Sequence, residues 1–309
     1  KNLLLQGAQA DTQGLVQLRH LAPLLNLKKQ KKVLNELSGS HTSNIRGRGV
    51  DFSEVRSYQA GDDIRGMDWR VTARTGVPHI KLYQEERERP VHIMCDLRAN
   101  MFFGSQVRFK SLQAVQIASL LSWAALAHGD RIGGLVVSES EIKDLKPKGN
   151  KKGVLNLLQL LNSKGQVPEK AGTKSHTGLL DALKHLRRTS KPGSALFLIS
   201  DFQGFDKDCE QQLYQLSRHN DVTAINIYDP LEAHLPPAGI YQVSNGQDRL
   251  QLNTQSRKIR ETYQQSFNQR QQKLQQYLLS LGIPLINITT QQDPVPVLQK
   301  GLGINGGSR

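Results

Sequence analysis

The chain has 309 residues, of which 37% are hydrophobic and 22% charged, and its formal net charge is +14 at pH 7. This length admits one large domain or two small ones, and no run of the roughly 20 apolar residues that a membrane-spanning helix needs is present. Two cysteines, Cys95 and Cys209, are too few for a disulfide framework or a cysteine-rich zinc site, so we expect a cytoplasmic protein.

The positive charge is unevenly distributed. Residues 1–50 hold 8 basic and 2 acidic side chains, and residues 151–200 hold 9 and 2. A basic surface is typical of nucleic-acid-binding proteins, although solvated helix faces often carry the same charge. No nucleic-acid-binding motif accompanies the charge and aromatic residues make up only 6% of the chain. Nucleic-acid binding is therefore kept as an alternative.

Residues 1–44 are predicted to form a helical N-terminal arm. Leu15, Leu18, Leu21 and Leu25 recur near helical spacing. The arm should divide into two shorter helices within residues 14–37, because Pro23 cannot continue a helix.

Residues 45–89 are predicted to form a small charged subdomain. From Gly47 to Arg74 the sequence reads GRGVDFSEVRSYQAGDDIRGMDWRVTAR, which is dense in both arginines and acids. Buried charge lowers stability unless it is paired, so we expect an ordered ion-pair network with buried aromatic anchors. Its predicted members are Arg56, Tyr58, Asp62, Asp63, Arg65, Asp68, Trp69 and Arg74.

Residues 90–290 alternate between strand and helix patterns, which predicts a mostly parallel sheet with helices on both faces. Apolar runs end at Asp96 and at Asp201. Ligands of such sheets bind where the strands end, so these two acids mark a candidate site. The glutamine-rich helix at 264–276, including Arg270, is expected on a solvated face away from this site. Residues 291–309 are predicted to be a flexible tail.

Several short motifs resemble one bacterial family. They include Gly61-Asp62-Asp63-x-Arg65, Asp68-Trp69 and the run from Asp96 to Gly104. The family is catalogued as domain of unknown function 58 and has a von Willebrand factor A-like domain. The resemblance implies an α/β, Rossmann-type fold with the helical arm and charged subdomain described above.

The resemblance also implies a degenerate metal site. Von Willebrand factor A domains hold Mg²⁺ or Mn²⁺ with an Asp-x-Ser-x-Ser motif, a Thr and a further Asp. The matching positions here are Asp96, Arg98, Asn100, Thr177 and Asp201. Because a guanidinium offers only donors and a permanent charge, we expect Arg98 to pair with Asp96 and Asp201. No cofactor is therefore expected, and Mg²⁺ or Mn²⁺ is disfavoured.

Family members are commonly encoded with a MoxR-type AAA+ ATPase. The resemblance thus implies a non-enzymatic adaptor that works with such an ATPase on an unknown client protein. A metal-dependent phosphoesterase built from Glu54, Asp62, Asp63 and Asp68 is an alternative. No spacing typical of a nucleophile and its base is present, so no catalytic residue is assigned.

Overall fold

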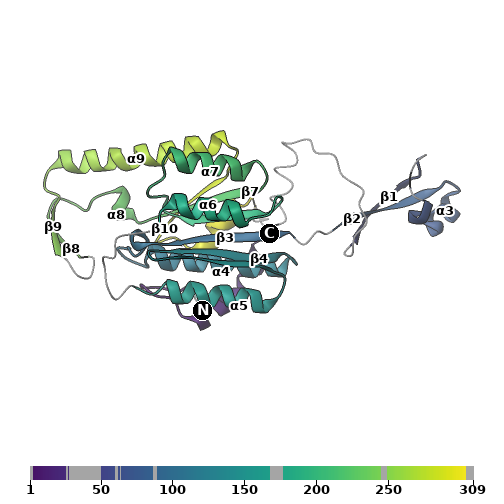
Figure 1. Ribbon diagram of the computed structural model, residues 1–309, viewed down its shortest axis with the longest axis horizontal. Coiled ribbons are helices and arrows are strands. Elements are labelled where there is room, and N and C mark those ends of the chain that lie inside the picture. Colours follow the sequence, from purple (N-terminus) through teal and green to yellow (C-terminus); the bar gives the residue numbers. More distant parts are fainter. Residues whose placement is uncertain are drawn as a thin grey trace. The chain divides into compact units, whose positions relative to one another are not determined.

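A computed structural model describes residues 3–25, 27, 50–59, 62, 64–85, 89–167, 177–244 and 249–303. The chain divides into two units, one formed by Lys1–Leu34 with Arg89–Arg309 and the other by Asn35–Glu88. We call them the α/β unit and the hairpin unit. Figure 1 shows the elements of each.

The α/β unit is built on a six-stranded sheet in the order β10-β7-β6-β3-β4-β5. Its strands are β3 (Pro90–Leu97), β4 (Arg131–Ser138), β5 (Ile142–Lys148), β6 (Ala195–Ser200), β7 (Asp221–Tyr228) and β10 (Leu285–Thr289). All pair in parallel except the edge strand β5. The central strands are nearly continuous apolar runs because both of their faces are covered. The predicted mostly parallel sheet is confirmed.

Helices cover both faces of this sheet (Figure 1). One layer contains α6 (Leu179–Thr189), α7 (Lys207–Ser217) and α9 (Arg257–Ser280), and the other contains α4 (Lys110–Ala127), α5 (Lys151–Lys164) and α10 (Pro294–Gly301). Side chains of β3 alternate between the two layers, since Ile93 and Cys95 pack into the α4 core whereas Met94 packs into the α6 core. The sheet is thus the shared wall of two apolar cores. The prediction of a flexible tail over residues 291–309 is wrong for α10, because its Val295 and Leu298 are buried in the same core as α4.

The N-terminal arm packs on α4. It consists of α1 (Thr12–Gln17) and two short 3₁₀ helices, η1 (Leu18–His20) and η2 (Ala22–Leu24). The indole nitrogen of Trp123 on α4 donates to the Leu15 carbonyl at 3.2 Å. Because the arm covers one side of α4 and the sheet the other, α4 is apolar around most of its circumference. The second predicted helix falls mostly on residues 28–37, which lie outside the described residues.

The other described elements of the α/β unit lie near the edge of the sheet at which the parallel strands end. They are η5 (Ala99–Met101), α8 (Pro230–Ala233) and the antiparallel hairpin of β8 (Ile240–Ser244) and β9 (Arg249–Asn253). Among the described residues, every helix is too short or too polar to cross a lipid bilayer.

The hairpin unit contains most of the charged signature. Strands β1 (Val50–Ser57) and β2 (His79–Glu85) pair antiparallel, and η4 (Ile64–Gly66) and α3 (Trp69–Thr75) lie between them in sequence. The Arg56 guanidinium contacts the Asp62 carboxylate at 2.8 Å, so the prediction that an arginine pairs with an acid in this segment is confirmed. Asp68 begins α3 by accepting from the backbone N–H groups of Arg70 and Val71 at 3.1 and 3.2 Å.

The prediction that Trp69 is buried is wrong. Trp69 is 67% exposed, and α3 has no buried side chain. Among the described side chains of this unit, Asp68 and Ile80 are the buried ones, and Tyr58 is half-buried. The described side chains of this small unit do not form an apolar interior large enough for an indole. Asp63 and the Arg65 side chain lie outside the described residues, and Arg74 is exposed.

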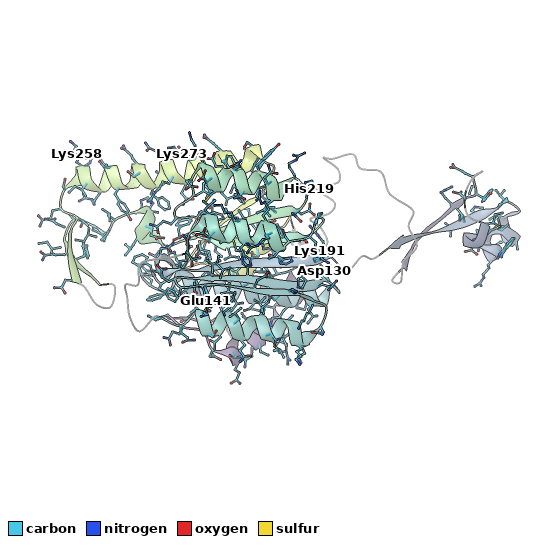
Figure 2. The ribbon with its side chains drawn as sticks, viewed as in Figure 1. Asp130, Glu141, Lys191, His219, Lys258 and Lys273 are labelled. Carbon is cyan, nitrogen blue, oxygen red and sulfur yellow. The ribbon has the colours of Figure 1, made fainter. Side chains whose placement is uncertain are left out.

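Leu25 and Arg89 lie close together on the α/β unit. A ring nitrogen of His128 lies 3.3 Å from the Leu25 carbonyl, and the Arg89 N–H donates to Asp130 at 3.1 Å. The Arg89 guanidinium also pairs with Asp221 at the start of β7. Figure 2 shows Asp130 near Lys191 and His219 at this edge, where the parallel strands begin. We call it the amino edge of the sheet.

The two tryptophans provide a test of this fold by fluorescence. Trp123 is 6% exposed and Trp69 is 67% exposed. Trp69→Phe, which leaves only Trp123, should give blue-shifted emission that acrylamide quenches weakly. Trp123→Phe should leave red-shifted, readily quenched emission, because the remaining indole faces water. Equal quenching of the two variants would contradict the exposure of Trp69.

Candidate functional site

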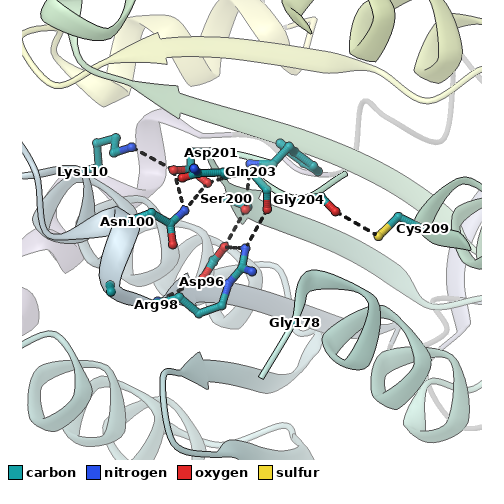
Figure 3. Close-up of polar contacts among 12 residues, drawn as sticks. Asp96, Arg98, Asn100, Lys110, Gly178, Ser200, Asp201, Gln203, Gly204 and Cys209 are labelled. Atoms are coloured by element: carbon teal, nitrogen blue, oxygen red, sulfur yellow. Dashed lines mark hydrogen bonds and ion pairs between the residues drawn. The ribbon is translucent and has the colours of Figure 1, made fainter. Parts of the chain in front are cut away.

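Acidic side chains meet at the edge where the parallel strands end, which we call the carboxyl edge. Asp96 lies near the end of β3, Asp201 follows β6 and Asp229 follows β7. The register pairs Cys95 with Ile199, so the ends of β3 and β6 are level. Strand spacing therefore brings together Asp96 and Asp201 (Figure 3), as the sequence predicted. Asp229 lies at the same edge, since it follows the adjacent strand β7.

Arg98 holds Asp96 in a buried bidentate ion pair. Its Nε lies 2.9 Å from Oδ1 and its Nη2 lies 2.7 Å from Oδ2. Ser200 donates to Oδ2 as well, at 2.7 Å. Burial disfavours the charged guanidinium, but the hydrogen bonds and charge of Asp96 outweigh it and raise the pKa of Arg98. Both Asp96 oxygens are thus occupied by donors of the chain itself.

Asp201 has its own donors. Asn100 Nδ2 lies 2.7 Å from both carboxylate oxygens, and Lys110 Nζ lies 2.8 Å from Oδ2. The Gln203 N–H donates to Oδ1 at 3.0 Å. Burial would raise the pKa of Asp201, but the Lys110 charge and these hydrogen bonds outweigh burial and lower it. Asp201 is therefore held ionised.

Lys110 is the central cation of the site. It is the first residue of α4, and its side chain is 0% exposed between Asp201 and Glu232, whose Oε1 lies 2.6 Å from Nζ. Burial alone would lower its pKa, but the two carboxylates raise it. Sequence reasoning missed Lys110, because a lysine that opens an apolar helix is usually exposed. We call Asp96, Arg98, Asn100, Lys110, Asp201 and Glu232 the edge network.

Asp229 extends this network towards β10. Its Oδ2 accepts from the Ser105 N–H at 2.9 Å and from the Thr290 hydroxyl at 2.6 Å. Glu232 in turn accepts from the Asp229 N–H at 2.9 Å. The loop that leads into α4 is tight at Gly104, where a Cβ atom would lie 2.2 Å from the Arg108 carbonyl oxygen. The loops after β3, β7 and β10 are therefore fixed to one another.

Phe202, which follows Asp201 directly, has a left-handed backbone conformation. Its φ is +53°, the one positive value among the described non-glycine residues. Such a conformation costs about 1–3 kcal/mol and persists where the surroundings fix it. Here the Phe202 N–H donates to Ser200 Oγ at 2.9 Å, and its ring is buried and meets Phe205 edge to face.

The edge network does not fit a divalent cation. Arg98 and Lys110 place positive charge beside the two carboxylates that the resemblance assigns to a metal. The predicted pairing of Arg98 with Asp201 is replaced by a 3.3 Å bond from Arg98 to the Gln203 carbonyl, because Asn100 and Lys110 already occupy Asp201. Thr177 is buried directly before Gly178, at the start of α6. No cluster of three or more His, Cys, Asp or Glu side chains suited to a metal occurs within the described ranges.

A cavity of about 410 Å³ opens beside the network. It lies between the loop at 201–205, the end of β7 and one face of α9. Arg270 lines it together with Asp201, so the expectation that this part of the glutamine-rich helix faces away from the site is wrong. The reason is helical spacing, since Tyr263, Phe267 and Arg270 recur on the same side of α9.

Comparison with known proteins places the chain among proteins of unknown function. The family described as "Protein of unknown function DUF58" matches residues 54–273. The uncharacterized proteins Mb1516 of Mycobacterium bovis and Rv1480 of Mycobacterium tuberculosis are each 30% identical over 215 residues, which is 70% of this chain. The chain spans 66%, just under two thirds, of the length of each relative.

Two solved structures are also similar. A conserved hypothetical protein BatB from Bacteroides thetaiotaomicron is 14% identical with a TM-score of 0.39, over 63% of this chain and 98% of that one. An aerotolerance-related membrane protein from Bacteroides fragilis is 13% identical with a TM-score of 0.42, over 70% and 98%. TM-scores this low do not establish a shared fold.

Replacement of Lys110 tests the edge network. Lys110→Met should lower the free energy of unfolding by about 3–5 kcal/mol, because it leaves the buried Asp201 carboxylate and the half-buried Glu232 without their cation. The matched control is Lys143→Met, whose partner Glu141 forms an exposed pair and should contribute less than about 1 kcal/mol. Urea denaturation measures both, and equal effects would contradict a buried role for Lys110.

The ion pair of Lys110 and Asp201 makes the stability of the fold depend on pH. The lowered pKa of Asp201 contributes stability above its usual value of 3.8, and that contribution is lost as pH falls through the folded pKa. The raised pKa of Lys110 contributes stability that is lost only as pH rises past 10.5. The Lys110→Met variant should therefore lose less stability than the unmodified chain at acidic pH and at alkaline pH. Thermal melts over a range of pH measure this difference.

Calorimetry with Mg²⁺ and Mn²⁺ tests the role of Arg98. The unmodified chain should show no binding at millimolar metal, because Arg98 occupies Asp96. Arg98→Ser should gain measurable affinity, since a hydroxyl and two freed carboxylate oxygens are ligands for these ions. Tight binding by the unmodified chain would contradict this assignment.

Proposed function

The chain belongs to the DUF58 family of proteins of unknown function, and we propose that it is a non-enzymatic adaptor that binds other proteins at its carboxyl edge. The observation that supports the proposal most directly is the edge network. Asp96 is paired with Arg98, and Asp201 and Glu232 share Lys110, so each carboxylate of the network binds a cation of the same chain. These contacts fix the loops of the carboxyl edge in one arrangement.

The chemistry of the edge favours binding over catalysis. A general base needs a free acceptor within hydrogen-bond reach of a substrate, whereas Asp96 and Asp201 already accept from Arg98, Ser200, Asn100 and Lys110. In the hairpin unit, Asp62 is held by Arg56 and Asp68 begins α3. These commitments also weigh against the alternative of a phosphoesterase built on the signature acids.

The geometry of the edge suits a partner protein. Loops from β3, β6 and β7 converge there, and the edge network holds them in one arrangement. A rigid surface loses less conformational entropy on binding than a mobile one. Exposed lysines near this edge, such as Lys143 and Lys207, would attract an acidic partner.

The partner that the family resemblance implies is a MoxR-type AAA+ ATPase. In this proposal the adaptor works in the cytoplasm, where it presents a client protein to the ATPase for maturation, remodelling or assembly. The client is a second partner of unknown identity. ATP hydrolysis by the partner would supply the energy, so the adaptor itself needs no catalytic centre.

Charge reversals at the two edges of the sheet test the proposal. Lys143→Glu with Lys207→Glu changes the carboxyl edge, and Lys191→Glu with Arg218→Glu changes the amino edge by the same charge. All four side chains are exposed. The protein is co-expressed with the MoxR-type ATPase of its host, and complexes are quantified by affinity capture with and without ATP.

We expect the carboxyl-edge variant to lose the complex, and the amino-edge variant to retain it. Rising salt should weaken the unmodified complex, because charged rims steer association. Loss of binding in the amino-edge variant alone would place the interface elsewhere. Absence of any complex between the unmodified protein and the ATPase would refute the proposed partner.

A further inference from the structure

We propose that the cavity beside α9 binds a peptide segment of a partner protein in which an aromatic side chain lies next to acidic residues. This inference rests on the proposed function, because the cavity adjoins the edge that the adaptor would present to its partners. It adds the chemical class of the ligand and a specific pocket for it.

The floor of the cavity is apolar. Phe202, Phe267 and Leu274 line it and are buried. Phe205 and Tyr228 add aromatic surface to the walls. A volume of about 410 Å³ lies within the range of ligand-binding pockets, which are roughly 300–1,000 Å³ and mostly apolar. The pocket therefore has room for one large aromatic side chain and part of its backbone.

The rim is positively charged. Arg270 and Lys273 line the cavity and are both exposed. Neither has an ion-pair partner in the part of the chain that the structure describes. The acids on the opposite wall, Asp201 and Glu232, are already bound by Lys110. Two cations beside an apolar floor favour a ligand that combines an apolar group with carboxylates. An arginine binds a carboxylate through paired hydrogen bonds.

The walls of the cavity are held in place before any ligand arrives. Asn226 of β7 donates to Gln271 of α9 at 2.8 Å, and the Tyr277 hydroxyl donates to the Glu210 carbonyl at 2.5 Å. The 201–205 loop is fixed by the Asp201 contacts described above. A preformed pocket that is open along an exposed helix rim suits an extended peptide, which can pass over the rim while one side chain enters.

Fluorescence anisotropy with synthetic peptides tests the inference. The probe is a fluorescein-labelled short peptide with one Phe flanked by glutamates. Matched peptides replace the Phe with Ala or the glutamates with Gln. The protein used is the full chain, and unlabelled phenylacetate serves as a small-molecule competitor. We expect the acidic aromatic peptide to bind and each matched peptide to bind at least about 10-fold more weakly, a difference of about 1.4 kcal/mol.

Two charge reversals on α9 locate the binding. Arg270→Glu lies at the cavity rim, whereas Lys258→Glu lies near the beginning of the same helix, where Figure 2 shows Lys258 far along α9 from Lys273. Both residues are exposed, so neither change should unfold the protein, which circular dichroism melts will confirm. Affinity for the acidic aromatic peptide should fall about 10-fold or more in Arg270→Glu and stay unchanged in Lys258→Glu.

The outcomes separate this inference from the proposed function. Equal binding by Arg270→Glu and the unmodified chain, or no binding of the acidic aromatic peptide, overturns the pocket assignment. Phenylacetate that competes as strongly as the unlabelled peptide overturns the peptide as its ligand. If the ATPase complex still forms in these cases, only the inference has failed. Failure of the adaptor proposal is read independently, as the absence of that complex.

Discussion

The ion pairs of Lys110 are the interaction on which the carboxyl edge depends. A buried ammonium must be neutralised, and Lys110 achieves this with one carboxylate from the loop after β6 and one from α8. Since Lys110 also begins α4, a single side chain joins the helix layer on one face of the sheet to the loops of two strands. Asp229 and Glu232 then connect the same point to β10 through Thr290. Moving any one of these elements would expose an unpaired charge to an apolar interior, which is costly.

Such an arrangement is an expensive way to gain stability, because well-packed apolar residues often serve as well as a buried ion pair. What it provides is a defined geometry. The strained Phe202 backbone lies between Ser200, which contacts Asp96, and Gln203, which contacts Arg98 and Asp201. Both halves of the network therefore constrain the loop that forms one wall of the cavity. The same contacts therefore hold the buried network together and determine the shape of the neighbouring cavity.

The sequence was informative where a local pattern decides the structure. Apolar runs of strand length ended at Asp96 and Asp201, and parallel strands necessarily bring such ends together, so both positions were predictable. The pairing of Arg98 with Asp96 was predictable from its side chain alone, whereas Asp201 is occupied by Asn100 and Lys110 instead. Lys110 was not, because its burial depends on Glu232, which is far away in sequence and reaches it only in the folded chain. Trp69 was misjudged since an indole usually marks a core, yet the hairpin unit is too small to contain one. Arg270 was misjudged because the glutamine-rich composition of its helix concealed which turn faces the pocket.

The hairpin unit lies within the sequence of the α/β unit, between Leu34 and Arg89. Leu25 contacts His128 and Arg89 contacts Asp130, two residues that are almost adjacent in the chain. The hairpin unit, Asn35–Glu88, is inserted in the sequence between two parts of the α/β unit, and neither apolar core of that unit includes a residue of it. Insertions of this kind can be gained, lost or exchanged between relatives while the host fold persists. The hairpin unit can therefore change in sequence without disturbing the two apolar cores of the α/β unit.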